Sequence, residues 1–329
     1  MNCFRRTLTA LLAGALLLVV VSARAQDAWP NKPIRLILGL PPGASTDFLA
    51  REVAQGLSDR LKVPVLVENK PGANTIIANN AVAKSAPDGY TLYVTNIVAA
   101  INPWIYEKLP FDYRKDMRNI ALLGVADNVF SVTPKVGIHN AREMIAYARN
   151  NPGKIAYGST GVGTIHNLLM ELIAEQANIQ VTHVPYKGAM AAVTDVIGGN
   201  ITGYFGTISS MQEFIKRGDL IPLFVTSEKR SVYLPDVETL AEAGLPPVAA
   251  GYWMGLSGPT GMPDSVVDKL NKAVNEVLRN PDVIRRLATQ AVDPLGGTPQ
   301  DMDKYYDEQL ALWKQAAAAA KMTPMAIDK

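Results

Sequence analysis

Short apolar runs alternate with amphipathic stretches in the first hundred residues of the chain. Residues 34–40, 65–67 and 90–95 are apolar runs of strand length. Between the first two runs, residues 46–61 have the apolar spacing of a helix. Its apolar positions lie four residues apart, at Leu49, Val53, Leu57 and Leu61. That spacing predicts a single buried stripe along the helix.

The same alternation continues through the middle of the chain. Strand-like runs at 129–133, 155–157, 181–184 and 203–205 are separated by helical patterns near 141–150, 165–172 and 190–197. Alternating strands and helices are typical of sheets with helices on both faces. We therefore expect an α/β fold with parallel-rich sheets flanked by helices. The C-terminal third is more helical, with helix starts at Pro263, Asn280 and Thr298.

Two glycine-bearing loops each join an apolar run to a helix. The first is Pro-Pro-Gly-Ala-Ser-Thr-Asp at 41–47, and the second is Gly-Ser-Thr-Gly-Val-Gly-Thr at 158–164. The start of a helix offers backbone N–H groups without partners and the positive end of the helix dipole, so it attracts anions. Both loops follow strands, where ligands of open α/β sheets bind. Two such loops facing each other predict a receptor for a small carboxylate.

The N-terminus has the three parts of a secretory signal peptide. Arg5 and Arg6 precede an apolar stretch of residues 8–21, and Ala23-Arg24-Ala25 follows it. The apolar stretch is shorter than the ~20 residues that a spanning helix needs. We expect cleavage after Ala25 and export to the periplasm, through general secretion rather than through the twin-arginine route.

Loss of this segment changes the charge and removes the cysteine. Its three arginines leave 29 basic residues of 32 against 30 acidic residues, a net charge of −1. That balance excludes a basic nucleic-acid footprint. The single cysteine, Cys3, is removed too, so the mature chain has no disulfide and no thiol nucleophile. About 304 residues remain, a length that usually forms two domains.

Motifs of catalysis and cofactor binding are missing from the sequence. Gly161-Val162-Gly163 begins like a dinucleotide fingerprint but lacks the last glycine, and Tyr157 stands where a nucleophile elbow needs glycine. The three histidines, His139, His166 and His183, are too scattered for a metal cluster. His183 lies in an apolar run and reads as a core residue. We find no nucleophile–base pair, and we expect no enzyme, metal or cofactor.

Several motifs, in order along the whole mature chain, resemble the Bug-type periplasmic receptors of tripartite tricarboxylate transporters. Besides the loop at 41–47, they are WPNKPIR at 29–35, VENKPGA at 67–73, APDGYTL at 86–92, AINP at 100–103, YGS at 157–159, VPYKG at 184–188, LPDV at 234–237 and AEAGLP at 241–246. Each motif alone is weak, but their order and spacing together are highly specific.

The resemblance implies a two-lobed periplasmic-binding-protein-like fold of the second type, with a cleft between lobes. Residues 1–25 would be the signal peptide, 27–125 and 226–329 the first lobe, and 126–225 the second lobe. The two strand–helix loops would grip the ligand carboxylate. Their contact residues would be Gly43, Ala44, Ser45, Thr46 and Asp47 from one lobe, and Ser159, Thr160, Gly161, Val162, Gly163 and Thr164 from the other. Further candidates for the cleft wall are Asn96, His166, Tyr186 and Thr207.

Each of these loop residues also has a purely structural interpretation. Ser45 and Thr46 could be helix caps, and the glycines could serve tight turns alone. Asp47 could be the first-turn acid that complements the helix dipole. Capping and anion binding are compatible, because a cap satisfies only some of the terminal donors.

Departures from the family pattern bear on the ligand. Ala44 replaces the second glycine after the paired prolines, and Gly206-Thr207 stands where relatives often have Asp-Asn. An acid there could contact an ammonium group, so its absence favours a carboxylate without one. The resemblance implies a monomeric periplasmic receptor that delivers this carboxylate to a membrane permease. The alternative is a receptor of the same fold that presents its ligand to a membrane sensor.

Overall fold

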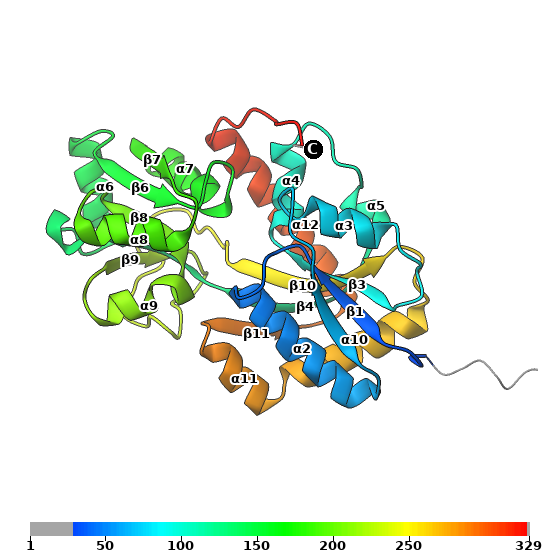
Figure 1. Ribbon diagram of the computed structural model, residues 1–329. Helices are drawn as coiled ribbons and strands as arrows, with labels where there is room; N and C mark the ends of the chain where they lie inside the picture. Colours follow the sequence, from blue (N-terminus) through cyan, green and yellow to red (C-terminus); the bar gives the residue numbers. More distant parts are fainter. Residues whose placement is uncertain (1–28, 328–329) are drawn as a thin grey trace, which may run out of the picture.

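Two sheets with helices on both faces form two lobes that lie side by side (Figure 1). The computed structural model describes residues 29–327, so the predicted signal peptide at 1–25 lies outside the described residues. Within residues 29–327, no helix has the length and apolar character needed to cross a membrane. The two-lobed α/β fold predicted from the sequence is confirmed.

The first sheet has six strands in the order β11-β4-β10-β3-β1-β2. These strands are β1 (Ile34–Leu38), β2 (Val65–Asn69), β3 (Thr91–Asn96), β4 (Met117–Ala126), β10 (Tyr252–Pro259) and β11 (Val292–Gly296). Strand β1 pairs parallel with β2 and β3, whereas β10 pairs antiparallel with β3 and β4, and β11 antiparallel with β4. The strands that alternate with helices are therefore parallel, and the strands near the lobe crossings are antiparallel.

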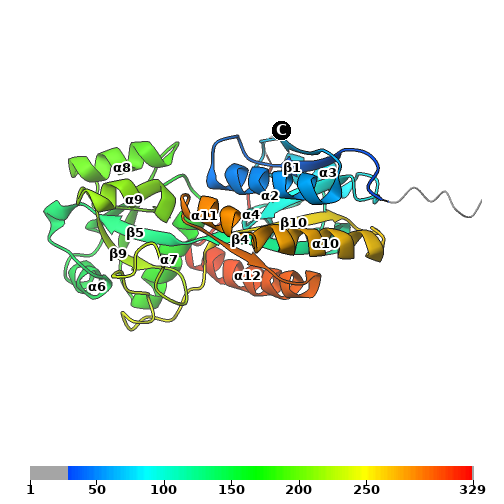
Figure 2. The same ribbon diagram turned by 90° about the horizontal axis from the view of Figure 1, so that it is seen from below.

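Helices cover both faces of the first sheet, because β1 is apolar on both faces. Leu36 and Leu38 pack toward α2 (Ser45–Leu61) and α10 (Asp264–Leu278), whereas Ile37 belongs to the core on the opposite face. That face carries α3 (Ile76–Ala83), α4 (Val98–Ile105) and α12 (Pro299–Ala319), and Figure 2 shows α2 and α12 on opposite sides of β4 and β10. The remaining helices of this lobe are α5 (Tyr113–Asp116) and α11 (Pro281–Ala288).

The second sheet has five strands in the order β7-β6-β8-β5-β9. They are β5 (Asn128–Val132), β6 (Ile155–Ser159), β7 (Val181–Pro185), β8 (Gly203–Thr207) and β9 (Ile221–Val225). Strand β6 pairs parallel with β7 and β8, and β5 pairs antiparallel with β8 and β9. One face carries α6 (Ala141–Asn150) and α7 (Ile165–Ala177), and the other carries α8 (Ala189–Gly198) and α9 (Ile208–Lys216). A 3-10 turn, Pro134–Val136, follows β5.

The chain passes between the lobes twice. The first crossing is at Asp127, the one residue between β4 and β5. The return runs through residues 226–251, and most of this segment packs on the second lobe: Glu238 Oε1 accepts from Ala141 N at 3.0 Å, and the Glu242 carbonyl accepts from Arg142 at 2.6 Å. We therefore propose that the return crossing lies at 250–251 rather than at 226.

One apolar core continues through both lobes on the side of α7 and α12. Helix α12 packs against β4 and also against α7 of the other lobe. The shared core includes Trp253 and Trp313 from the first lobe and Leu169 and Phe205 from the second. The lobes are thus joined by a packed side as well as by the two crossings.

Candidate functional site

Helix α2 begins without a side-chain cap. Its N-cap residue, Ala44, has extended backbone (φ −80°, ψ 163°), and no side chain accepts a hydrogen bond from the first turn there. Gly43 has φ +99°, a left-handed conformation that suits glycine. The preceding loop residues, 41–44, are all exposed. The first-turn N–H groups of α2 are therefore left for water or an anion.

Asp47, three residues into this turn, supports the loop. Its carboxylate accepts from Arg51 at 2.9 and 3.0 Å, from Asn69 Nδ2 at 3.0 Å and from the Gly43 N–H at 3.1 Å. Burial by itself would raise the pKa of Asp47, but these hydrogen bonds outweigh it and lower that pKa. The side chain is only 7% exposed. Its oxygens are occupied by the protein, so Asp47 fixes the shape of the loop.

Helix α7 begins in the same way in the other lobe. Its N-cap residue, Thr164, has extended backbone and does not cap the helix, because its hydroxyl donates to the Gly161 carbonyl at 2.7 Å. The Gly163 N–H donates to Asn167 Oδ1 at 3.0 Å, as the Gly43 N–H does to Asp47. Both loops thus have an exposed rim, Thr160 and Val162 here, and an uncapped first turn.

The α7 loop lies against the first lobe. A Cβ atom added to Gly163, whose φ is +73°, would lie 3.3 Å from Met322 Cε and 3.8 Å from Ile105 Cδ1. The start of α2 lies on the side of the first lobe that faces the second (Figure 1). The structure therefore directs both helix starts toward the boundary between the lobes.

Ser159 and His183 form a pair that the sequence analysis missed. Ser159 Oγ lies 2.7 Å from His183 Nε2, and the serine also accepts from the Gly161 N–H at 3.1 Å. The expectation that His183 is a core residue was wrong: it is partly exposed, and burial lowers its pKa. A hydrolytic serine must reach a substrate, whereas Ser159 is fully buried. The pair holds the loop rather than attacking a ligand.

His166 is buried beneath the start of α7. Its Nε2 lies 3.0 Å from Asn128 Oδ1, and its ring lies against Phe205 with centroids 5.7 Å apart. Burial lowers the pKa of His166 to about 4, so the ring is neutral at neutral pH. No described atom partners its Nδ1.

This buried histidine predicts a pH-dependent stability. Because its folded pKa of about 4 lies below the ordinary 6.5, the unfolded chain takes up a proton that the folded chain refuses. Its contribution is therefore present above pH 6.5 and is lost as the pH falls toward 4, by up to ~3 kcal/mol. Urea unfolding measures the free energy of unfolding at each pH. Between pH 7 and 4.5, this free energy should fall less in His166→Phe than in the wild type. Equal slopes in the two proteins would contradict this assignment.

The remaining predicted wall residues are engaged by their own lobes. Asn96 is fully buried at the end of β3, where its Oδ1 accepts from Val98 N at 3.0 Å. Tyr186 donates its hydroxyl to Asp195 at 2.7 Å. Thr207 is the N-cap of α9 without capping it, and its hydroxyl pairs with Ser209 at 3.1 Å. Thr207 and Tyr186 are partly exposed and remain available to a ligand, whereas the fully buried Asn96 does not.

The loop after β2 has an unusual backbone that the sequence did not reveal. Ala73, Asn74 and Thr75 all have positive φ, from 43° to 69°. Non-glycine residues adopt this region rarely, and here three do so in a row. Asn74 and Asn102 hold the loop by reciprocal hydrogen bonds of 2.8 and 3.0 Å. The loop lies against the end of β1, where a Cβ atom added to Gly39 would lie 2.6 Å from Thr75 Cβ.

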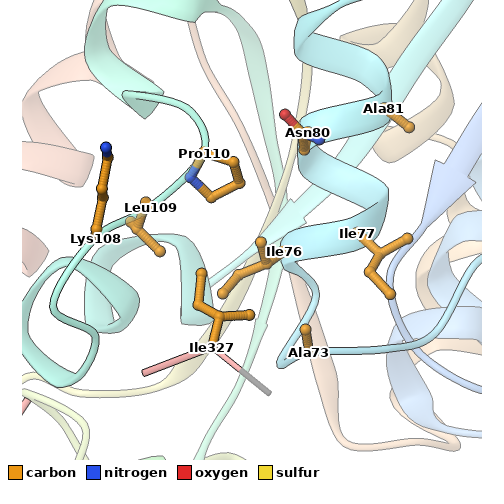
Figure 3. Close-up of a pocket in the computed structure, with 9 residues that line it drawn as sticks. All are labelled: Ala73, Ile76, Ile77, Asn80, Ala81, Lys108, Leu109, Pro110 and Ile327. Atoms are coloured by element: carbon orange, nitrogen blue, oxygen red, sulfur yellow. The ribbon is translucent and has the colours of Figure 1, made fainter. Parts of the chain in front are cut away.

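A cavity of about 700 Å³ lies beside the loop after β2 and apart from the loops that precede α2 and α7 (Figure 3). It is lined by Ala73, Ile76, Ile77, Asn80, Ala81, Lys108, Leu109, Pro110 and Ile327. No residue predicted for the site lines it. Its lining is apolar apart from Asn80 and Lys108, so it lacks the convergent donors that a carboxylate needs. Among residues 29–327, no three His, Cys, Asp or Glu side chains are grouped to hold a metal ion.

The chain matches one protein family over most of its length. The family described as "Tripartite tricarboxylate transporter family receptor" matches residues 49–321. The Bordetella pertussis protein BugT is 32% identical over 289 residues, which cover 87% of this chain and 89% of BugT.

Two solved structures of similar proteins contain a carboxylate. The R. palustris protein Rpa4515 with adipate is 28% identical, with a TM-score of 0.78, over 90% of this chain and 100% of that chain. MatC from Rhodopseudomonas palustris with bound malate is 25% identical, with a TM-score of 0.74, over 88% of this chain and 100% of that chain.

Proposed function

Since this chain belongs to the receptor family of tripartite tricarboxylate transporters, we propose that it captures a small organic carboxylate and delivers it to a membrane permease. The Bug-type resemblance found in the sequence is confirmed by the family match and by BugT. The predicted signal peptide places the mature receptor in the periplasm, where it would act as a monomer.

The observation that carries this proposal is the pair of uncapped helix starts, one in each lobe. Neither Ala44 nor Thr164 caps its helix with a side chain. In this proposal the ligand carboxylate accepts from first-turn N–H groups of α2 on one side and α7 on the other. The loop residues 43–46 and 160–164 provide the contacts from rims exposed at residues 43, 44, 160 and 162, while Asp47 and Ser159 shape the loops from below.

Such a grip makes closure depend on the ligand. An anion held by one helix start in an open form gains the second set of donors only when the lobes approach. That difference in affinity between the open and closed forms would drive a hinge motion. The packed side formed by α7 and α12 leaves the opposite side of the boundary free to open.

The ligand we propose is a carboxylate without an ammonium group. The end of β8 offers Gly206 and Thr207, with no acidic side chain at these two positions. Rpa4515 holds adipate and MatC holds malate, and both molecules are carboxylates that lack an ammonium group. An amino acid would leave its charged ammonium without a partner at this end of the strand.

Calorimetric titration of the mature chain, residues 26–329, tests the proposal. Adipate, malate and other mono-, di- and tricarboxylates form the panel, with aspartate as the ammonium-bearing counterpart of malate. Adipamide, the uncharged diamide of adipate, is the control for charge. We expect a carboxylate to bind and to stabilise the fold, by ~2.7 kcal/mol at a hundred times its Kd. Tight binding of aspartate, with no binding of carboxylates that lack an ammonium group, would contradict the proposed ligand class.

A further inference from the structure

We propose that His166 is a positioning residue that couples the start of α7 to both crossings between the lobes. The inference rests on the proposed function, since it takes the start of α7 as one side of the grip. His166 lies in the first turn of this helix, two residues after the N-cap Thr164. In this proposal it acts through Asn128 and does not contact the ligand.

Four buried residues form the coupling cluster, which we define as His166, Asn128, Thr226 and Ala250. Each is no more than 6% exposed. His166 Nε2 lies 3.0 Å from Asn128 Oδ1, and Asn128 Nδ2 donates to the Ala250 carbonyl. That carbonyl also accepts from Thr226 Oγ1 at 3.0 Å. Asn128 follows the first crossing and Ala250 begins the second, so the cluster joins both crossings to α7.

The hydrogen bonds fix the tautomer of His166. The Ala250 carbonyl can only accept, so the side-chain NH₂ of Asn128 must face it and Asn128 Oδ1 must face the histidine. An amide oxygen requires a donor, so the proton of the neutral ring is on Nε2. Nδ1 then carries a lone pair without a described partner in a buried position. Leaving Nδ1 unpaired costs free energy, so the bond from Nε2 to Asn128 is the hydrogen bond that holds the ring in place.

The first lobe holds the adjacent peptide from the other side. Gln309 of α12 donates its Nε2 to the Ala249 carbonyl at 3.2 Å, and Trp313 Nε1 donates to Gln309 Oε1 at 3.2 Å. Consecutive carbonyls, at 249 and 250, are therefore bound by opposite lobes. Rotation of the lobes must bend the chain at this peptide and at Asp127, because the chain crosses between the lobes at these two places.

This arrangement connects ligand capture to the pivot. An anion at the start of α7 acts on the turn that carries His166, and His166 is bonded to the segment about which the lobes rotate. Loss of the hydrogen bond from His166 leaves Asn128 Oδ1 without this partner. The segment at 249–250, about which the lobes rotate, is then held less firmly. We therefore expect the cluster to set one resting angle between the lobes even without a ligand.

Distance measurements between the lobes test this in the ligand-free mature protein. Spin labels go on Ala191→Cys of α8 and Lys272→Cys of α10, both exposed, because the mature chain has no other cysteine. We expect one narrow distance population in the otherwise unchanged protein and its loss in His166→Phe. His166→Gln, whose amide can donate to Asn128, should restore it. Tyr113→Phe removes a buried hydroxyl bonded to Asn119 and Ser257 in the first lobe and should leave the population unchanged.

A second variant keeps the test decisive where His166→Phe does not fold. Thr226→Val keeps the side-chain shape and removes only the hydroxyl bond to the Ala250 carbonyl, and it should also broaden the distances. If His166→Phe folds and keeps the narrow distance population, the proposal is overturned. If His166→Phe does not fold, the same outcome in Thr226→Val overturns it. A loss of that population in Tyr113→Phe as well would also overturn it, since any buried deletion would then suffice.

The tautomer of His166 provides a second, independent test of the cluster. Nitrogen NMR of histidine-labelled protein should show Nε2 protonated and Nδ1 bare in His166 from pH 7 to 5. A His166 ring that titrates near its ordinary pKa, or that carries its proton on Nδ1, contradicts the cluster. Neither experiment contains a carboxylate ligand, so failure here is distinct from failure of the ligand titrations.

Discussion

Replacing Ala44 by aspartate is expected to stabilise the fold and to abolish carboxylate binding. Ala44 is exposed, has the extended backbone of an N-cap residue and provides no cap. An aspartate at this position accepts from first-turn N–H groups of α2 and should add about 1 kcal/mol of stability. The new carboxylate occupies the place that we assign to the ligand carboxylate.

The loss of binding should be large because two like charges would share one set of donors. At a separation of about 4 Å and an effective dielectric constant near 20, their repulsion reaches ~4 kcal/mol, or roughly a thousandfold in Kd. Calorimetry measures the affinity and urea unfolding measures the stability of the same sample. Ala44→Ser is the matched control: it caps the helix without a charge and should lose far less affinity. Undiminished binding in Ala44→Asp would place the anion elsewhere.

Replacing Asp47 by alanine is expected to destabilise the protein by about 2–3 kcal/mol and to weaken ligand binding. The change removes the acceptor of hydrogen bonds from Arg51, Asn69 and Gly43. Half-exposed Arg51 can return to water, so the cost stays below that of breaking a fully buried ion pair. Without its anchor at Gly43, the loop no longer holds the first turn of α2 toward a ligand.

Asp59 provides the control on the same helix. It is exposed and accepts from Gln55 at 3.0 Å, so Asp59→Ala should change the free energy of unfolding by no more than about 0.5 kcal/mol. The lowered pKa of Asp47 adds a second signature. Its contribution is present above the unfolded pKa and is lost as the pH falls through the folded pKa, so Asp47→Ala should flatten acid unfolding. Equal destabilisation by the two variants would contradict the role given to Asp47.

The elements with strong apolar periodicity were predictable from the sequence. The helix expected over 46–61 is α2, Ser45–Leu61, and the apolar run at 155–157 is the start of β6. Both follow from local spacing, which decides which side chains can be buried. The positions of the two glycine-bearing loops, at 41–47 and 158–164, were predictable too, because each loop joins a predicted strand to a predicted helix. Their contact with a ligand stays a prediction.

Pairings between distant residues were not predictable in this way. Ser159 and His183 lie 24 positions apart on neighbouring strands, so no local motif links them. His166 and Asn128 meet because α7 lies over the start of β5, which depends on the whole second lobe. The run expected at 129–133 is β5, but its antiparallel direction had no signal, since periodicity does not report strand direction. Strand β4 was not among the predicted runs. The left-handed backbone at 73–75 was not predictable either, because none of these three residues is glycine.

A crystal structure of the mature protein with adipate or malate, whichever binds more tightly, tests the central claim most directly. The account predicts one carboxylate within hydrogen-bond distance of backbone N–H groups in the first turns of both α2 and α7. A carboxylate that contacts only one lobe, or that lies in the cavity beside Ile76 and Lys108, would contradict it.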